Sequence, residues 1–340
     1  MIFKAMAWCF LVALTPAVAQ DVVSLVGSGS NVPSPLYTVW IDDFNKKDPR
    51  VQVRYLPLGT SASLEQISLG SGDFGGGEII LRNDEMRGGK VPLVQIPTVV
   101  VGIVPIYNLP GDPELNFTGD MLAQIFLGKL NRWNDSRLAR LNPKLKLPDL
   151  EITVVHRTPG KGSNYIFTDF LSKSSSEFRA RVGKSPSPHW PTGMEANRGE
   201  DMVSKVAAVQ GAIGYVEWNF AKHSGIGYAA IENPAGQFVR ANTATIAAAC
   251  KAMEGSIPND FRISLIDAPG KDSYPISSFT WIYLPTSNWS GARGRALKDF
   301  LHWALESGQS VAEAQGYAVL PHAIQVKVEA AVDSLANGAK

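Results

Sequence analysis

The sequence predicts an α/β fold. Short β-branched runs alternate with amphipathic segments, beginning with a strand at residues 22–26 and a helix at 35–46. A second strand at 51–55 and a helix at about 61–69 continue the alternation. Strands that alternate with helices in this way form largely parallel sheets with helices on both faces. We therefore expect a mostly parallel sheet covered by helices.

The rest of the chain continues this pattern without one dividing linker. Residues 94–107 are apolar and β-branched, which predicts a buried strand, and the run is too short to span a bilayer. A second such run at 276–284 precedes a helical C-terminal third. Further helices are expected at 119–127, 136–141, 164–171, 202–209, 291–305, 311–315 and 324–335. Two domains would therefore be joined by more than one segment.

The N-terminus has the pattern of a secretory signal peptide. Lys4 precedes an apolar stretch at residues 5–14, and residues 17–19 read Ala-Val-Ala, a small-x-small cleavage site. Pro16 interrupts the apolar stretch too early for a transmembrane helix. We expect cleavage after Ala19 and a soluble exported protein.

Composition excludes several functional classes. The chain has 32 basic and 31 acidic residues. Cleavage of the signal peptide would remove Lys4 and no acidic residue, so the mature chain would carry equal numbers of basic and acidic residues. This balance argues against a nucleic-acid or membrane-surface partner. Cys250 is then the only cysteine, which excludes an intramolecular disulfide, and the five histidines form no H-E-x-x-H motif. We expect no metal and no cofactor.

Residues 155–167 (VHRTPGKGSNYIF) contain the clearest signal for a ligand. A β-branched run ends in Arg157, and a loop with Gly160 and Gly162 then opens a helix near Ser163. Arginine supplies a planar, permanently charged fork. Glycines let backbone N–H groups approach a ligand, and a helix N-terminus adds partial positive charge. The segment predicts an anion site.

Three other glycine-rich segments, at 27–31, 58–63 and 72–78, also follow predicted strands. Ligands in open α/β sheets lie beyond the carboxyl ends of strands, where such turns gather. Each segment alone is better explained as an ordinary βα turn, in which glycine supplies a positive φ. Gly160-Lys161 does not complete a P-loop, and no G-x-S-x-G nucleophile elbow occurs, which argues against nucleotide hydrolysis and an α/β-hydrolase.

Longer segments carry a more specific signal. They are GSGSNVPSPLY (27–37), LVQIPTVVVGIVPIYNLPG (93–111), IFLGKLNRWND (125–135), LNPKLKLPDLEITVVHR (141–157), YIFTDFLSK (165–173), HWPTG (189–193), GAIGYVEW (211–218) and GYAVLP (316–321). In this order they resemble the periplasmic phosphate-binding proteins of phosphate-specific ABC transporters, across nearly the whole mature chain.

The resemblance implies a type II periplasmic binding protein, a two-domain clamshell in which each domain is a mixed, mostly parallel sheet flanked by helices. Domain I would hold residues 20–99 and 277–340, and domain II residues 100–276, with crossings near 97–101 and 276–280. The implied function is non-enzymatic. A monomer in the periplasm captures inorganic phosphate between the domains and delivers it to an ABC transporter permease in the inner membrane.

The resemblance also implies a set of phosphate-binding residues. They are Asn31, Val32, Thr60, Glu78, Arg157, Lys161, Gly162 and Ser163. Arg157 pairs with the anion, while Thr60 and Ser163 keep hydroxyl groups. Val32 contributes its backbone N–H, and Asn31 an amide in place of a hydroxyl.

The largest departures from the family pattern lie at three positions. Glu78 replaces an aspartate that accepts a hydrogen bond from protonated phosphate, Lys161 replaces a serine, and Pro159 replaces an aspartate that braces the arginine. Glu78 either reaches the ligand or pairs with Lys161, and the second arrangement would suit a ligand without a proton. Another oxyanion (sulfate, a phosphonate or a polyanion) is therefore the alternative cargo.

Two functions of other classes are also considered. An enzyme acting on phosphate esters would need a base such as Glu78, but no activated nucleophile or metal-ligand cluster accompanies Arg157. A sensor or adhesive surface protein without ligand binding is disfavoured because Arg157 and the glycine donors are retained.

Overall fold

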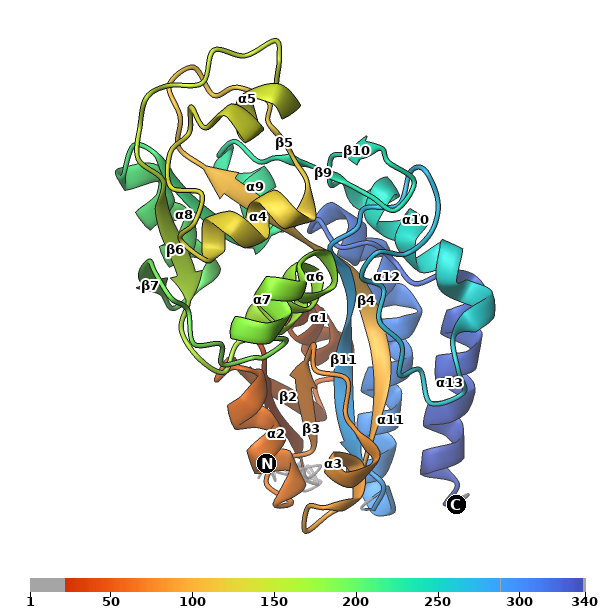
Figure 1. The fold of residues 1–340 in the computed structure, drawn as a ribbon. Coiled ribbons are helices and arrows are strands. Elements are labelled where there is room, and N and C mark those ends of the chain that lie inside the picture. Colours follow the sequence, from red (N-terminus) through yellow and green to blue (C-terminus); the bar gives the residue numbers. More distant parts are fainter. Residues whose placement is uncertain (1–21, 288, 339–340) are drawn as a thin grey trace, which may run out of the picture.

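One mixed eight-stranded sheet connects the two halves of the molecule, with helices on both of its faces (Figure 1). The computed structural model describes residues 22–287 and 289–338, so the predicted signal peptide and its cleavage site lie outside the described residues. Across the sheet the strands are β2 (Val51–Leu56), β1 (Val23–Gly29), β3 (Phe74–Gly77), β11 (Ser277–Pro285), β4 (Leu93–Tyr107), β8 (Ala212–Glu217), β6 (Thr153–Arg157) and β7 (Met194–Ala196).

Strand β4 is shared between two lobes. Its first part pairs antiparallel with β11 as far as Gly102, and from Ile103 onward it pairs antiparallel with β8. The first lobe comprises β1, β2, β3, β11 and the beginning of β4. The second lobe comprises β6, β7, β8 and the end of β4. The two lobes are thus joined through one continuous strand, as Figure 1 shows.

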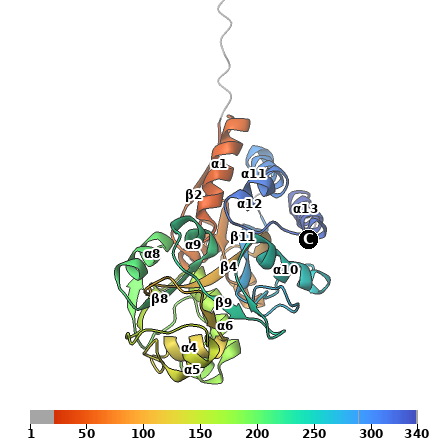
Figure 2. The ribbon, with the colours of Figure 1, turned by 90° about the horizontal axis from the view of Figure 1, so that it is seen from above.

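Helices cover both lobes. The first lobe carries α1 (Ser34–Lys47), α2 (Thr60–Ser68), α3 (Asn83–Arg87), α11 (Gly291–Leu305), α12 (Ser307–Ala314) and α13 (His322–Ala336). The second carries α4 (Gly119–Phe126), α5 (Ser136–Leu141), α6 (Gly162–Ser174), α7 (Ser176–Arg181), α8 (Gly199–Ala208) and α9 (Trp218–Ser224). Seen from above, α4 and α5 lie on the opposite side of β4 from α11 and α13 (Figure 2).

Each lobe combines parallel strand pairs with antiparallel pairs made by β4 or β11. In the first lobe β1 pairs parallel with β2 and β3, and in the second β6 pairs parallel with β7 and β8. Their carboxyl ends therefore carry the loops that enter α2 and α6. The expected two-domain α/β architecture with mixed sheets and flanking helices is confirmed.

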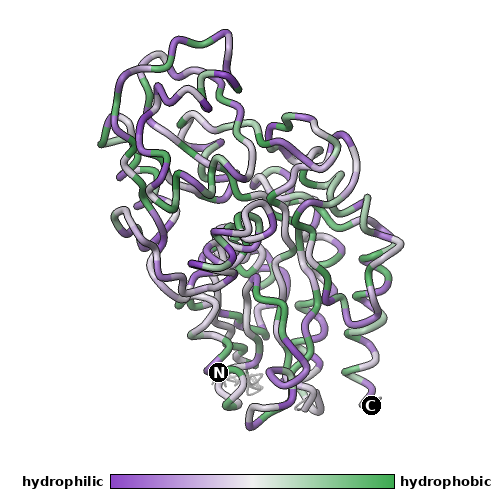
Figure 3. The backbone as a smooth tube through the Cα atoms, viewed as in Figure 1, coloured by the Kyte–Doolittle hydropathy of each residue, from purple (hydrophilic) through white to green (hydrophobic). Residues whose placement is uncertain are grey.

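The core follows the central strands. All but one of the fifteen residues of β4 are buried, and β11 is buried almost as completely. Figure 3 shows hydrophobic residues along these strands and hydrophilic ones over the outer loops. No helix in residues 22–287 and 289–338 is both long and apolar enough to cross a membrane.

A long connection returns the chain from the second lobe to β11. It contains β9 (Ala230–Glu232), β10 (Phe238–Val239), α10 (Thr243–Met253) and η1 (Glu254–Ser256), and its two strands form a small sheet with β5 (Asn116–Phe117), which follows β4. Beyond η1, Arg262 Nη1 donates a hydrogen bond to the Leu81 carbonyl of the first lobe at 2.9 Å. This connection therefore touches both lobes.

The predicted helices and long strands are observed within a few residues, whereas α10, β8 and several shorter elements were not predicted. Strand β3 has the sequence FGGG, which was expected to form a loop. It is a strand because glycine permits close packing: a methyl group on Gly76 would lie 2.6 Å from the Tyr55 hydroxyl. The strands β5, β7, β9 and β10 have two or three residues each, too few to produce a periodic pattern.

Candidate anion-binding site

Two helix N-termini from different lobes meet at the candidate site. Helix α2 begins after Gly59, whose φ of +102° favours glycine, and α6 begins after Lys161. Across the gap, the Ser61 N–H donates to the Gly160 carbonyl at 3.3 Å. Helix N-termini favour negative charge because their first N–H groups lack partners within the helix. Both lobes thus direct partial positive charge toward one region.

Arg157 lies at the end of β6 and is only 1% exposed. Its backbone N–H donates to the Tyr215 hydroxyl at 3.1 Å, and its Nη2 donates to the Asn197 carbonyl at 3.2 Å. Nη1 is 3.7 Å from Glu217 Oε2, and neither Nε nor Nη1 has a hydrogen-bond partner among the described residues. The guanidinium is therefore anchored on one side and has two donors left for a ligand.

Glu78 follows β3 and is fully buried. The Thr60 hydroxyl donates to its Oε2 at 3.0 Å, while Oε1 has no partner among the described residues. Burial raises the pKa of the Glu78 carboxyl to about 8, and Glu217 acts in the same direction. The hydroxyls of Ser30 and Thr60, and the charge of Arg157, oppose that rise in pKa. The carboxyl is an acid with an unusual affinity for its proton.

Gly162 and Ser163 form the first turn of α6. A methyl group built on Gly162 would overlap Glu78 Oε2 and lie 2.9 Å from Thr60 Oγ1, so this position has no room for a side chain. Ser163 is fully buried, and its Oγ has no hydrogen-bond partner among the described residues. This turn therefore offers a buried hydroxyl group on the residue after Gly162, against which Glu78 packs.

Lys161 is half-buried at the edge of the site. The structure records neither an ion pair nor a hydrogen bond between Lys161 and Glu78, both of which it describes, so the pairing considered from the sequence does not occur. Its Nζ lies 3.7 Å from a methyl group built on Gly59. Burial, together with Arg157 and Arg198, lowers the pKa of the Lys161 ammonium group. The cationic side chain extends toward the opposite lobe.

Asn31 and Val32, the two predicted ligand residues in the loop after β1, have different surroundings. The Val32 N–H donates to Ser30 Oγ at 3.1 Å, and its carbonyl accepts from the Tyr317 hydroxyl at 2.7 Å. The predicted backbone donor is therefore engaged by Ser30. Asn31 is half-buried and borders a small cavity of about 50 Å³ together with Arg198.

Sequence reasoning missed the residues that hold Arg157. Pro159 cannot brace it, and the structure supplies Glu217 and the Asn197 carbonyl instead. A sequence signal for Glu217 exists, because it is a carboxylate directly after the apolar β-branched end of β8. No comparable signal marks Asn197, which acts through its backbone.

The combined site can hold a tetrahedral oxyanion. Buried polar atoms without a partner among the described residues include Arg157 Nε and Nη1, Ser163 Oγ and Glu78 Oε1. The guanidinium and hydroxyl can donate to ligand oxygens, and the carboxyl can exchange a hydrogen bond with a ligand hydroxyl. No group of three or more His, Cys, Asp or Glu able to hold a metal ion occurs in the described part of the chain.

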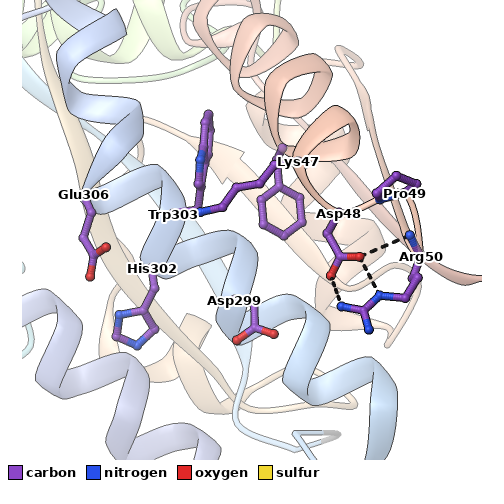
Figure 4. A pocket seen from close by; sticks show the side chains of 9 residues that line it. Lys47, Asp48, Pro49, Arg50, Asp299, His302, Trp303 and Glu306 are labelled. Carbon is purple, nitrogen blue, oxygen red and sulfur yellow. Dashed lines mark hydrogen bonds and ion pairs between the residues drawn. The ribbon is translucent and has the colours of Figure 1, made fainter.

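A cavity of about 680 Å³ lies elsewhere, in a groove between the end of α1 and α11 (Figure 4). Its charged residues are mostly exposed, and Arg50 donates to both carboxylate oxygens of Asp48 at 2.8 and 3.0 Å. The side chains of Asp299 and His302 from α11, and of Glu306 just after its end, project toward this groove. We call this feature the α1–α11 groove.

Comparison with known proteins places this architecture in a known class. The fold is that of a periplasmic binding protein, and residues 14–307 match a family model described as a PBP superfamily domain. The chain is 34% identical over 322 residues to the phosphate-binding protein PstS of Xylella fastidiosa strain Temecula1, covering 93% of this chain and 87% of that protein. The chain belongs to the PstS family of phosphate-binding proteins.

Solved structures show the same fold at lower identity. A high-affinity periplasmic phosphate-binding protein, PfluDING, bound with phosphate, has a TM-score of 0.68 at 18% identity and covers 91% of this chain and 93% of its own. An ABC-type phosphate transport receptor from Vibrio cholerae has a TM-score of 0.59 at 17% identity, covering 87% of this chain and all of its own.

Proposed function

We propose that this protein captures inorganic phosphate between its two lobes and delivers it to an ABC transporter. One observation carries the proposal: the buried Arg157 has two donor atoms without a partner among the described residues, and the partnerless Ser163 hydroxyl and Glu78 carboxyl lie beside α6. Unpaired buried polar atoms are costly, and a tetrahedral oxyanion would satisfy them together.

Binding would proceed by closure of the lobes around the anion. We propose that residues 20–99 and 277–340 move against residues 100–276, with β4 and β11 as the crossing strands. The change of partner of β4 at Gly102 and Ile103 supports this division. Hinge closure of this kind removes water and strengthens charge-assisted hydrogen bonds to the ligand.

The binding residues we propose are Thr60, Glu78, Arg157, Gly162 and Ser163, with Lys161 at the edge. Asn31 and Val32 belong to the same loop region, and Val32 would need to exchange its bond to Ser30 in order to contact the ligand. The names of the relatives favour phosphate over the other oxyanions.

The role is that of a receptor and not of an enzyme. The family to which the chain belongs is named for phosphate binding, and one solved neighbour is named a transport receptor. We further propose a periplasmic monomer, released by cleavage after Ala19, that docks on a permease in the inner membrane.

Equilibrium titration of the purified chain beginning at Gln20 tests the function. We expect saturable binding of one phosphate per chain, and we expect Arg157→Lys to weaken it because an ammonium group cannot replace the guanidinium fork. A folded protein that does not bind phosphate at millimolar concentration would overturn the proposal.

A further inference from the structure

Residues 257–268, part of the long connection that returns the chain to β11, lie between helix α6 and the first lobe. We call this segment the strap. It contains no helix or strand, yet its side chains Ile257, Phe261 and Leu265 are buried. The strap is therefore a packed segment, and its hydrogen bonds decide which parts of the molecule it connects.

Helix α6 of the second lobe holds the middle of the strap. Lys173 Nζ donates a hydrogen bond to the Ile266 carbonyl at 3.0 Å. The Ser264 hydroxyl donates to Asp169 Oδ2 at 3.2 Å. Because α6 also begins at the candidate anion site, a movement of α6 away from the first lobe would draw the strap with it.

Arg262 connects the strap to the first lobe. Asp260 accepts a hydrogen bond from Arg262 Nε at 2.8 Å and pairs with Nη2 at 2.7 Å, so the guanidinium is held in one orientation. Its Nη1 donates to the Leu81 carbonyl at 2.9 Å. The N–H of Leu81 donates to Gln95 Oε1 of β4 at 2.8 Å, which fixes this peptide within the first lobe. Arg262 therefore joins two parts that are each anchored in a different lobe.

The contact beside Arg262 is incompletely filled. Phe261 is only 3% exposed and has a φ of +60°, a left-handed conformation that costs energy in a bulky residue and persists where the surroundings enforce it. It borders a cavity of about 530 Å³ whose other walls include Met86, Ile96 and Leu335 of the first lobe. A cavity provides fewer dispersion contacts than a filled interface. The hydrogen bond of Arg262 is therefore an important part of the connection between the strap and the first lobe.

We propose, on the basis of the proposed closure around phosphate, that Arg262 is a positioning residue for phosphate capture. Its bond to Leu81 stabilises the closed arrangement, in which the Ser61 N–H also donates to the Gly160 carbonyl at 3.3 Å. Among the described residues, Arg262 has no hydrogen bond or ion pair with the proposed binding residues. A bond present only in the closed protein raises the closed fraction, and the apparent affinity for phosphate rises with that fraction.

The rate at which the purified chain releases labelled phosphate into an excess of unlabelled phosphate tests the proposal. Arg262→Met should raise this rate about 10-fold, because it removes a hydrogen bond from a charged donor. Arg262→Lys keeps a cationic donor and should restore part of the loss. Arg240→Met is the matched control, since Arg240 pairs with Glu114 at 2.8 Å within the second lobe, and its rate should equal that of wild type. Thermal unfolding without phosphate shows whether each variant is folded.

A second variant breaks the connection at its other end. Lys173→Met should raise the release rate by less than Arg262→Met, because the bond from Ser264 to Asp169 remains. Added to Arg262→Met, it should have no further effect, since the two links act in series. Effects that multiply in the double variant would overturn the proposal.

The outcomes separate this inference from the proposed function. A wild-type protein that binds no phosphate removes both. Normal phosphate binding by wild type, with a wild-type release rate in folded Arg262→Met, overturns the inference alone, even where that variant unfolds at a lower temperature. If Arg262→Met does not fold, a wild-type release rate in Lys173→Met overturns the inference instead.

Discussion

The interlobe site and the α1–α11 groove are both lined by charged residues, yet they differ in almost every physical respect. The groove has a volume of about 680 Å³ and its charges are mostly exposed, with Asp48 and Arg50 satisfying each other. In the interlobe site Arg157, Glu78 and Glu217 are buried, and several of their polar atoms have no partner among the described residues.

The difference teaches that volume alone does not locate a ligand site. Exposed ion pairs contribute little to stability and are satisfied by water when a partner is lost. Buried charges that lack full hydrogen bonding are costly, so a protein keeps them where a ligand completes the network. Equivalent substitutions in the two regions should therefore have unequal effects on phosphate binding and on stability.

The largest contrast should come from removing the arginine of each region. Arg157→Met should weaken phosphate binding about 100- to 10,000-fold, because it removes two charge-assisted hydrogen bonds worth ~1.5–3 kcal/mol each. Arg50→Met, in the groove, should leave phosphate affinity unchanged. Titration of both variants, after thermal unfolding has shown that they are folded, checks the comparison. Equal affinities in both variants would contradict it.

The two regions should also respond to pH in opposite directions. The pKa of Glu78 is raised to about 8 from 4.5 in the folded protein, so its proton is held there after the unfolded chain has lost it. The Glu78 proton contributes fully to the free energy of unfolding at pH values below the pKa that the carboxyl has in the unfolded chain. This contribution, at most ~3–5 kcal/mol, is lost as the pH rises through about 8.

The control for this pH effect is Asp48. Its hydrogen bonds to Arg50 lower the pKa of the carboxyl, so its contribution is present above its unfolded pKa and is lost as pH falls. Urea unfolding at several pH values should show wild type losing stability relative to Glu78→Gln toward pH 8, and Asp48→Asn differing from wild type only toward acid pH. Parallel curves for wild type and Glu78→Gln would refute the assignment.

A smaller effect should follow from filling the space at Gly162. Gly162→Ala should weaken phosphate binding about 10- to 100-fold, because overpacking typically costs ~1–3 kcal/mol and the methyl group collides with Glu78. Combining it with Glu78→Asp, which withdraws the carboxyl, should restore part of the loss. Gly255→Ala is the matched control, since a methyl group there meets no atom within 4 Å. Additive effects in the double variant would contradict the steric pairing.

The smallest effect should come from the cation at the edge of the site. Lys161→Ser should slow phosphate association about 3- to 10-fold at low salt and have little effect at high salt, because screening removes long-range attraction. Lys47→Ser, in the groove, should not change the association rate. Stopped-flow measurements of phosphate association at two ionic strengths test this contrast. A slower association of Lys161→Ser that does not depend on salt would indicate a direct contact between Lys161 and phosphate instead.

Much of the fold was predictable because its long elements have strong patterns. The apolar β-branched runs of β4 and β11 and the amphipathic helices α1, α11 and α13 were all expected from the sequence. Strand β3 was missed because three glycines carry no strand signal, and its pairing depends on Tyr55 and Tyr283 packing against it from elsewhere in the chain.

The candidate site was predictable only in part. Arg157, Gly162 and Ser163 stand in one local motif, and Thr60 and Glu78 follow other strands, so these positions could be found from the resemblance. Whether Glu78 would meet Lys161 or Gly162 depends on how two lobes close, which no local pattern encodes. The role of Glu217 is likewise a product of tertiary structure, since 60 residues separate it from Arg157.

Anomalous diffraction from crystals grown with arsenate, a tetrahedral analogue of phosphate, tests the central claim most directly. The arsenic peak should lie between the lobes, with its oxygens within hydrogen-bonding distance of Arg157, Ser163 and Glu78. A peak in the α1–α11 groove with none between the lobes would contradict the account.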